Sequence, residues 1–286
     1  KFPSRARRDG LGAGFPMKHV PFIVAILLSG GSFWLADRAV RDLPPRVDID
    51  GRLLRMRIEG EGSPAVVLEI GLGGALEEWA AVQPEVARFT KVVAYDRLGA
   101  VDKQSLLTGQ DVARELHAAL TRAGVEPPYI LVGQSFGGIY NRIFASMYPQ
   151  EVAGMVLLDP SQEDFIKWME QHHPTRCISR ADVVNWPEGA GIWATLDELS
   201  SSPPLPDVPT IVATGTRESD DPIRIEVLPV WTKSHADWVV TLAQGRHVLV
   251  PESGHGVHVE ASRLVVDLIR EVALDARRGT KETNSD

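Results

Sequence analysis

Short apolar segments that alternate with helical stretches restrict this chain to a small group of folds. Strands that are apolar along their whole length are buried on both faces, which is typical of parallel strands covered by helices. Because connections between parallel strands are right-handed, the helices cover both faces of the sheet. The pattern therefore predicts an α/β fold with a doubly wound, mainly parallel sheet. The apolar segments are residues 65–70, 92–95, 129–132, 155–158, 210–213 and 247–250, and the helical stretches include residues 111–123, 138–147 and 261–276.

Two more strands are predicted ahead of this alternation. Residues 46–49 and 53–58 flank the dipeptide Asp50-Gly51. An Asp-Gly pair between two alternating segments is typical of a tight β-hairpin. We therefore expect the sheet to begin with a hairpin.

The connection after the sixth predicted strand is too long for a simple crossover. Residues 160–208 contain Trp168, Trp186 and Trp193, and a structureless loop of that length is uncommon inside a compact domain. We expect a helical lid there, whose tryptophans either line a pocket for an apolar substrate or fill the lid's own core. The core of the fold then comprises residues 46–159 and 209–276, followed by a polar tail at residues 277–286.

The first 45 residues form a separate region. Basic residues around Met17 precede an apolar run at residues 20–36, and Pro44-Pro45 follow as a stiff linker. A basic start before an apolar run resembles a secretory signal peptide or a short membrane anchor. We expect residues 1–45 to direct export, periplasmic or secreted, or membrane association; a buried N-terminal helix is the alternative.

Composition excludes several function classes. The chain has 30 Lys and Arg against 38 Asp and Glu, for a formal net charge of -8, which gives nucleic-acid binding no electrostatic support. Its single cysteine, Cys177, excludes an intrachain disulfide and a cysteine metal cluster. The pair His172-His173 has no third ligand at a metal-binding spacing. No cofactor or metal is implied.

The most specific local motif is Gly-Gln-Ser-Phe-Gly-Gly at residues 133–138. It lies between a predicted strand and a predicted helix, and a G-x-S-x-G motif in that context is typical of a nucleophile elbow. Side chains at Gly133 and Gly137 would collide with the neighbouring strand and helix. The helix N-terminus directs backbone N–H groups at a developing oxyanion. We therefore predict that Ser135 is the nucleophile of a serine hydrolase.

Three further segments resemble motifs of the α/β-hydrolase superfamily. They read Glu-Ile-Gly-Leu-Gly-Gly at residues 69–74, Tyr-Asp-Arg at 95–97 and Ser-Gly-His at 253–255. With the elbow, they make residues 46–276 similar to bacterial esterase- and lipase-like members that carry an ESGLG-like loop, a YDR segment, a GxSxGG elbow and a late SGH. Such relatives often continue Gly-x-Gly-x-Ser after the YDR segment, whereas residues 98–103 read Leu-Gly-Ala-Val-Asp-Lys. That loop borders the active site in the fold, so the resemblance does not identify a substrate.

The base and the oxyanion hole follow from the same fold. A serine hydroxyl needs a base to take its proton, and in this fold the histidine follows the last core strand. We predict that His255 is this base. Of the two competing histidines, His247 lies inside a predicted strand, and His258 is expected in a loop or in contact with the site residues. The oxyanion needs two N–H donors. One is predicted at the backbone of Phe136, and the resemblance implies the other at the backbone of Leu72.

Two carboxylates are candidates for the acid that orients the histidine. Asp159 ends the sixth predicted strand and precedes a proline, as in lipases whose acid lies at that strand end. Glu218 follows the seventh predicted strand, the commoner position in the superfamily, but about 37 residues separate it from His255. A helical stretch predicted at residues 229–242 lies within that connection. We predict Asp159, with Glu218 as the alternative acid. The neighbouring Asp96 and Arg97 are expected to tie loops together by hydrogen bonds and an ion pair.

These assignments predict hydrolysis of a carboxylic ester through an acyl-enzyme. The expected substrate is a small ester with an apolar acyl part. Amide, peptide or C–C bond hydrolysis on the same triad is the alternative among enzymes. A catalytically silent member of the fold that acts as a binding protein is the alternative of another class.

Overall fold

The structure, a computed structural model, describes residues 46–49, 51–97, 107–173 and 188–283. Eight strands form one sheet in the order β1-β2-β4-β3-β5-β6-β7-β8. The strands are β1 (Arg46–Ile49), β2 (Arg52–Glu59), β3 (Ala65–Glu69), β4 (Val92–Tyr95), β5 (Tyr129–Gln134), β6 (Val152–Leu158), β7 (Thr210–Gly215) and β8 (Gly245–Val250). Each predicted strand is present, and the ends differ by three residues or fewer.

The sheet is antiparallel at one edge and parallel elsewhere. β1 pairs antiparallel with β2, and β2 pairs antiparallel with β4. All pairs from β4 to β8 are parallel. In the hairpin, Ile49 lies opposite Arg52 and the Gly51 N–H donates to Asp48 Oδ1 at 2.7 Å. The predicted hairpin and the mainly parallel sheet are both confirmed.

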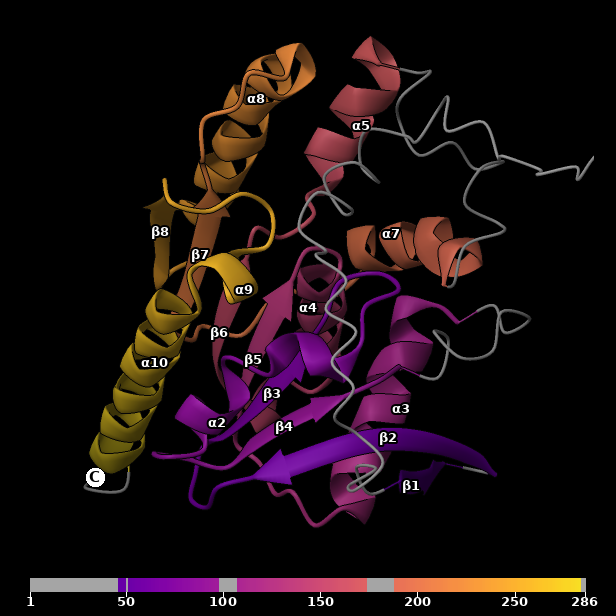
Figure 1. Ribbon diagram of the computed structural model, residues 1–286. Coiled ribbons are helices and arrows are strands. Elements are labelled where there is room, and N and C mark those ends of the chain that lie inside the picture. The colour runs from indigo at the N-terminus through magenta and orange to yellow at the C-terminus, as the bar shows by residue number, and fades with distance from the viewer. Residues whose placement is uncertain (1–45, 50, 98–106, 174–187, 284–286) are drawn as a thin grey trace, which may run out of the picture.

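Helices cover both faces of the sheet (Figure 1). On one face lie α3 (Gly109–Arg122), α4 (Gly137–Met147) and α7 (Ile192–Ser200), and on the other lie α2 (Gln83–Val86), α9 (Val257–Glu260) and α10 (Ser262–Thr283). α5 (Glu163–His172) and α8 (Pro222–Val239) extend beyond the ends of the strands. The short 3-10 helices are η1 (Leu76–Trp79), η3 (Pro149–Glu151) and η4 (Gly189–Gly191).

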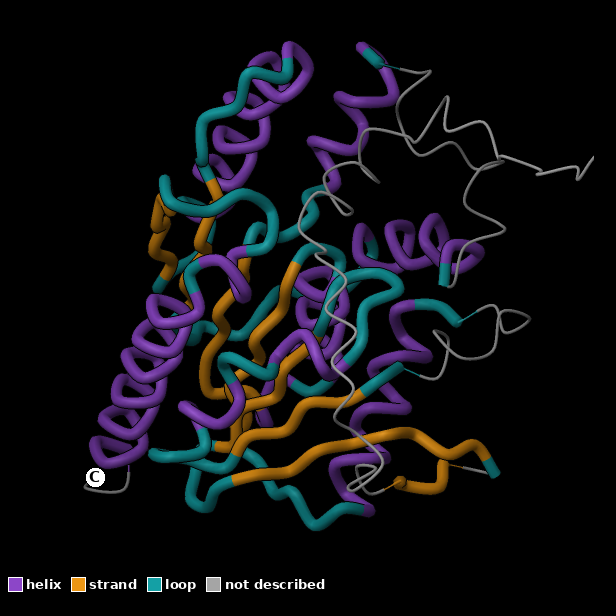
Figure 2. Tube along the Cα trace, in the orientation of Figure 1, coloured by secondary structure: helices purple, strands orange, loops and turns teal. Residues whose placement is uncertain are grey.

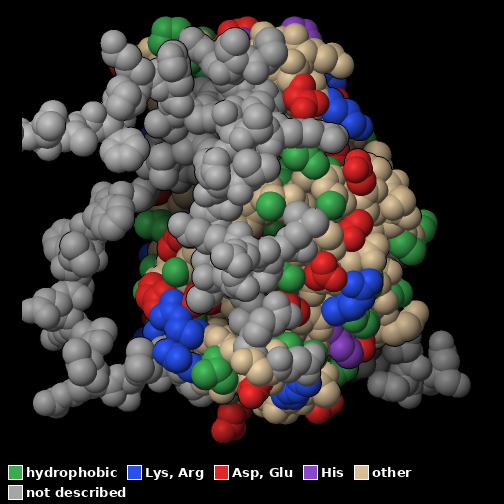
Figure 3. Space-filling model, turned by 90° about the vertical axis from the view of Figure 1, so that its right-hand side faces the viewer, with side chains coloured by type: hydrophobic (Ala, Val, Ile, Leu, Met, Phe, Trp, Pro, Cys, Tyr) green, Lys and Arg blue, Asp and Glu red, His purple; other side chains and the backbone are tan. Residues whose placement is uncertain are grey.

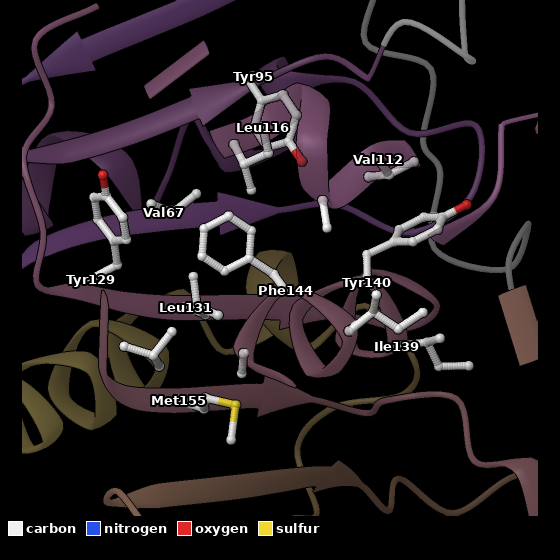
Figure 4. Packing of buried hydrophobic residues seen from close by; sticks show 14 of the residues in the cluster. Val67, Tyr95, Val112, Leu116, Tyr129, Leu131, Ile139, Tyr140, Phe144 and Met155 are labelled. Carbon is white, nitrogen blue, oxygen red and sulfur yellow. The ribbon is translucent and has the colours of Figure 1, made fainter. Parts of the chain in front are cut away.

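The two cores use alternate residues of the same strands, because successive side chains point to opposite faces. In β5, Tyr129 and Leu131 pack with α3 and α4, whereas Ile130 and Val132 pack with α10. Figure 4 shows the first core, in which Phe144 of α4 points toward Leu131. This double burial explains why the strand segments are apolar throughout.

Two helices differ from their predicted bounds. A helix was predicted at residues 229–242, but α8 spans Pro222–Val239, because Asp221 caps its start by accepting from the Ile223 N–H at 2.9 Å. The last helix was predicted to end at residue 276, but α10 continues to Thr283, so the predicted polar tail begins as helix. Arg277 of that extension donates to the backbone carbonyl of Ser63 at 3.0 Å.

Helices α5 and α7 occupy the connection between β6 and β7 for which a helical lid was predicted. Residues 174–187, including Trp186 and Cys177, lie outside the described residues. That α5 and α7 act as a lid stays a prediction.

The predicted anchor at residues 20–36 also lies outside the described residues. Within the described residues, none of the helices has the length and apolarity needed to cross a membrane. On the face drawn in Figure 3, acidic and basic side chains are interspersed over the described surface.

Candidate active site

The predicted site residues gather at the carboxyl ends of the parallel strands. Figure 2 shows the loops that leave the sheet at this edge. Ser135 follows β5, Asp159 follows β6, and His255 lies in the loop after β8. In open α/β sheets, ligands bind outside this edge.

Ser135 occupies a strained turn. Its φ is +55°, which is unusual for a residue with a side chain. The Ser135 N–H donates to the carbonyl of Leu158 at 3.0 Å, and its own carbonyl accepts from the N–H groups of Gly138 and Ser161, both at 3.0 Å. Hydrogen bonds on both sides therefore hold the backbone of this turn in place. The side chain leaves a turn that leads directly into α4.

The predicted need for glycine in the elbow is confirmed. A Cβ at Gly137 would lie 2.6 Å from the carbonyl oxygen of Glu69. A Cβ at Gly133 would lie 2.6 Å from the amide nitrogen of Asn141. Both distances are far inside van der Waals contact, so the elbow packs against β3 and α4 only with glycine at these positions.

His255 is bound to Asp159. Its Nδ1 lies 2.7 Å from Asp159 Oδ2, and both side chains are buried. Gln134, next to Ser135 in the chain, donates from its side-chain amide to the His255 carbonyl at 3.2 Å. Nε2 of His255 is buried, and none of the described residues hydrogen-bonds to it. The bond at Nδ1 therefore fixes the imidazole, and Nε2 is available to accept or donate a proton.

Asp159 is held by three hydrogen bonds. Besides the bond to His255, its Oδ1 accepts from the Gly215 N–H at 3.1 Å and from the indole N–H of Trp231 at 2.8 Å. Its backbone has φ +46°, and its N–H donates to the carbonyl of Ala213 at 2.6 Å. A carboxylate accepts hydrogen bonds only, so these three donors fix the orientation of the Asp159 side chain.

Glu218, the alternative acid, lies elsewhere. Its side chain is exposed, and it borders a surface hollow with Arg224 and Leu228. The bonds that join β7 to the histidine loop come from other residues: the Arg217 N–H donates to the Ser253 carbonyl at 2.9 Å. The structure thus brings Asp159 to His255 and leaves Glu218 at the surface.

Three other histidines lie near the site and have partners other than Asp159. His247 of β8 lies 2.7 Å from the Thr214 hydroxyl, which also lies 2.7 Å from Nδ1 of the buried His235. Nε2 of His235 lies 2.7 Å from the Pro160 carbonyl, next to Asp159. His258 of α9 packs on the ring of Trp79, with 5.0 Å between ring centroids.

The Thr214 hydroxyl and the rings of His235 and His247 form a chain of hydrogen bonds in which all donors point in one direction. A carbonyl accepts only, so His235 donates from Nε2 and accepts the Thr214 hydroxyl at Nδ1, and Thr214 accepts from His247. Burial lowers the pKa of His235 to about 4, although nearby Asp159 opposes this. The neutral ring therefore supports the backbone just after Asp159.

The predicted oxyanion loop lies beside the serine. A Cβ at Gly71 would lie 3.1 Å from Cβ of Ser135, so the loop after β3 contacts the elbow. Among the described residues, the backbone N–H groups of Leu72 and Phe136 have no acceptor. These two donors are available to a ligand.

A buried ion-pair network supports the loop. Arg97, after β4, donates to Glu69 of β3 and, from Nε, to Glu188 Oε1 at 2.5 Å. Less than 5 % of each of these three side chains is exposed. Tyr95 donates its hydroxyl to Glu69, and the guanidinium lies 5.0 Å from the ring centroid of Tyr140.

The network also sets the charge of its members. Burial alone would lower the pKa of Arg97, but Glu188 and Glu69 raise it well above its ordinary value. Burial would raise the pKa of Glu188, yet Arg97 lowers it. For Glu69 burial prevails over Arg97, and the pKa is raised. Arg97 and Glu188 therefore form the firmly ionised pair.

Sequence reasoning found the loop-tying role of Asp96 and Arg97, because both follow a strand in the YDR segment. Asp96 accepts from the Leu76 N–H at 2.8 Å, in agreement with that prediction. Sequence reasoning missed Trp231 and Glu188. Trp231 gave no local signal, since it lies 72 residues from the aspartate it binds, and Glu188 lies 91 residues from Arg97.

Comparisons with known proteins agree with this architecture. Residues 64–176 match the family model described as the alpha/beta hydrolase fold. YqjL of Bacillus subtilis is 22% identical over 217 residues, 72% of this chain and 82% of that protein. RutD of Cronobacter turicensis, named as a carbamate hydrolase, is 30% identical over 148 residues. That match covers 50% of this chain and only about half, 52%, of RutD.

Solved structures share the fold. A thermophilic esterase from Thermogutta terrifontis superposes with a TM-score of 0.55 at 20% identity, covering 79% of this chain and 97% of the esterase. Together with the eight-stranded sheet, these matches define the class: the chain has the α/β-hydrolase fold.

Proposed function

We propose that this protein is a serine hydrolase that cleaves carboxylic esters through an acyl-enzyme, with Ser135, His255 and Asp159 as its triad. The observation that carries the proposal is the buried bond between His255 Nδ1 and Asp159 Oδ2 at the edge of the sheet where the strained Ser135 turn lies. An ionised carboxylate can only accept, so His255 donates from Nδ1 and presents a basic Nε2. This is the protonation state that a general base requires.

In the proposed reaction, Ser135 Oγ attacks the ester carbonyl while His255 Nε2 takes its proton. The N–H groups of Leu72 and Phe136 stabilise the oxyanion, assisted by the dipole of α4. His255 then returns the proton to the leaving alkoxide. Water attacks the acyl-enzyme by the same route, with His255 again as base, and releases the acid.

An apolar acyl group suits the surroundings. The partly exposed side chains of Leu72 and Trp193 pack against the core cluster that includes Phe136. Apolar walls with a few directed polar groups are typical of small-molecule sites. An ester with an apolar acyl part is therefore the substrate we propose.

We also propose that the protein is exported or membrane-associated through residues 1–45.

Cleavage of a C–N bond is the second candidate. It is favoured by the 30% identity to RutD, named as a carbamate hydrolase, over half of this chain. The same triad and oxyanion donors serve either bond, because both reactions pass through a tetrahedral intermediate. Matched aryl esters, anilides, carbamates and 1,3-diketones of equal acyl length distinguish ester, amide, carbamate and C–C cleavage.

The Ser135→Ala variant tests the proposal. It removes one oxygen from a turn whose backbone bonds remain, so the variant should fold while kcat falls by roughly 10⁴-fold or more. A fluorophosphonate should label wild type at Ser135. Ser146→Ala is the matched control, because this buried serine of α4 only donates to the Pro203 carbonyl at 2.9 Å.

Two results would overturn the assignment. One is turnover near the wild-type rate in a folded Ser135→Ala variant. The other is fluorophosphonate labelling at a different residue. A silent binding protein, the alternative from another class, would hydrolyse none of the substrates and take up no label.

A further inference from the structure

Arg97 contacts the oxyanion loop through two backbone carbonyls. Its Nη1 donates to the carbonyl of Ile70 at 2.5 Å, and its Nη2 donates to the carbonyl of Gly71 at 2.6 Å. The carbonyl of Gly71 and the N–H of Leu72 belong to the same peptide unit. A hydrogen bond to the Gly71 oxygen therefore acts on the unit that carries the Leu72 N–H.

Because a peptide unit is planar, fixing the direction of its C=O also fixes the direction of its N–H. In a trans peptide, C=O and N–H point in opposite directions. β4 and β5 flank β3 on opposite sides in the sheet. Arg97 follows β4 and draws the Gly71 carbonyl to that side, so the Leu72 N–H faces the β5 side, where Ser135 lies.

Glu188 fixes the next peptide. Its Oε2 accepts from the Gly73 N–H at 2.9 Å and from Arg97 Nη2 at 2.8 Å. This leaves the Leu72 N–H between two constrained neighbours and without an acceptor among the described residues. Because Glu188 belongs to the connection between β6 and β7, the segment predicted as a lid supplies part of this support.

We propose that Arg97 and Glu188 are positioning residues that hold the Leu72 N–H in the oxyanion hole, a role that rests on the function proposed above. They touch neither the substrate nor the reacting atoms. Their ionic bond stays in place through the reaction, so the N–H needs no reorientation as negative charge develops on the substrate oxygen. Preorganised donors of this kind stabilise a transition state more than a ground state.

The test compares an ester with the matching thionoester. Sulfur accepts hydrogen bonds poorly, so the oxyanion donors favour the oxygen ester. Arg97→Lys keeps the charge but loses the planar fork that reaches both carbonyls. Glu188→Gln removes the charge and keeps the shape. For both variants we expect kcat for the ester to fall by about 10- to 100-fold, since loss of one donor costs about 10²–10³-fold.

The readout is the ratio of kcat/KM for ester to thionoester. Fluorophosphonate titration of active sites first corrects for any unfolded fraction. A misplaced N–H should lower the ratio by about tenfold, because the ester loses more than the thionoester. A merely structural role would reduce both substrates equally and leave the ratio unchanged.

Arg142→Lys is the matched control. Arg142 also forms a largely buried pair, with Glu163 at 2.8 and 2.9 Å, but it joins α4 to α5 and does not bond to the oxyanion loop. Its ratio should stay at the wild-type value. An unchanged ratio in active Arg97→Lys and Glu188→Gln would overturn this inference. Ester hydrolysis by Ser135→Ala would instead overturn the proposed function, so the two failures are distinguishable.

Discussion

The two sides of the candidate site are held by different kinds of bond. After β6 to β8, Asp159 is bound by a backbone N–H, an indole N–H and the imidazole of His255. After β3 and β4, the oxyanion loop is bound by the buried ions Arg97 and Glu188. One side thus places a single carboxylate among neutral donors, whereas the other surrounds neutral peptides with charges.

The difference follows from what each side must present. In the proposed reaction, the acid side must keep one negative charge next to an imidazole that becomes protonated, and neutral donors achieve this without competing for that charge. The oxyanion side must present uncharged N–H groups in a fixed direction, which the short bonds of a planar guanidinium to carbonyls provide. Buried ions are costly to leave unpaired, so the loss of one ionic partner on the oxyanion side should lower the free energy of unfolding as well as the activity.

The largest effect is expected from breaking the acid side. Asp159→Asn replaces the carboxylate that orients His255 and stabilises its protonated form, so kcat should fall at least about 10²-fold with little change in substrate binding. Glu218→Gln is the matched control, since its side chain is exposed, and it should cost under about 10-fold. Steady-state kinetics of the folded variants decide between them. The reverse ranking would move the acid to Glu218.

A smaller effect is expected when one neutral donor is removed. Trp231→Phe keeps an aromatic ring against Phe165, whose centroid lies 4.6 Å away, but loses the N–H that Asp159 accepts. We expect kcat to fall about tenfold, which corresponds to about 1.4 kcal/mol for a charge-assisted bond. Trp168→Phe serves as control, because Trp168 stacks on Phe165 in the same small cluster. Equal losses in both variants would assign the effect to packing instead.

The acid side also predicts a pH dependence of stability. Burial lowers the pKa of His235 from its ordinary 6.5 to about 4; Asp159 opposes this shift, and His247 and His255 add to it. Between these values the unfolded chain binds more protons than the native one, so the free energy of unfolding falls as pH drops from 6.5 to about 4. This depression corresponds to about 3 kcal/mol.

His235→Gln should remove most of that slope, because glutamine can donate to the Pro160 carbonyl and accept from Thr214 without titrating in this range. Urea unfolding at pH 7, 5.5 and 4.5 measures it. The same pH slope in both proteins would show that His235 is not its source.

The smallest effect is expected from removing residues 1–45. A chain that begins at Arg46 should keep kcat and KM on small esters within about twofold, because all eight strands of the sheet and the candidate site residues belong to the later part of the sequence. The full chain should partition with membranes or be exported when expressed in bacteria. An insoluble or inactive truncated chain, beside a soluble cytosolic full chain, would make residues 1–45 part of the fold.

Local patterns in the sequence were enough to predict the strands, the hairpin and the elbow. Continuous apolar segments identify strands buried on both faces, and Asp50-Gly51 identifies the hairpin turn, because these features depend on neighbouring residues. The helix bounds were less predictable. Asp221 starts α8 earlier than its apolar pattern suggests, and α10 extends into a segment that composition alone classed as a tail.

The sequence by itself determined which residues are candidates for chemistry, and the tertiary structure decided which of them meet. Ser135 and His255 were predictable because each lies in a short motif next to a strand. The sequence favoured Asp159 over Glu218 through the strand end before a proline and the long connection from Glu218 to His255, but only the arrangement of the sheet brings Asp159 within 2.7 Å of a histidine 96 residues away. Glu188 reaches Arg97 over 91 residues in the same way. Such pairings depend on strand order and on the paths of crossovers, which no local pattern of side chains encodes.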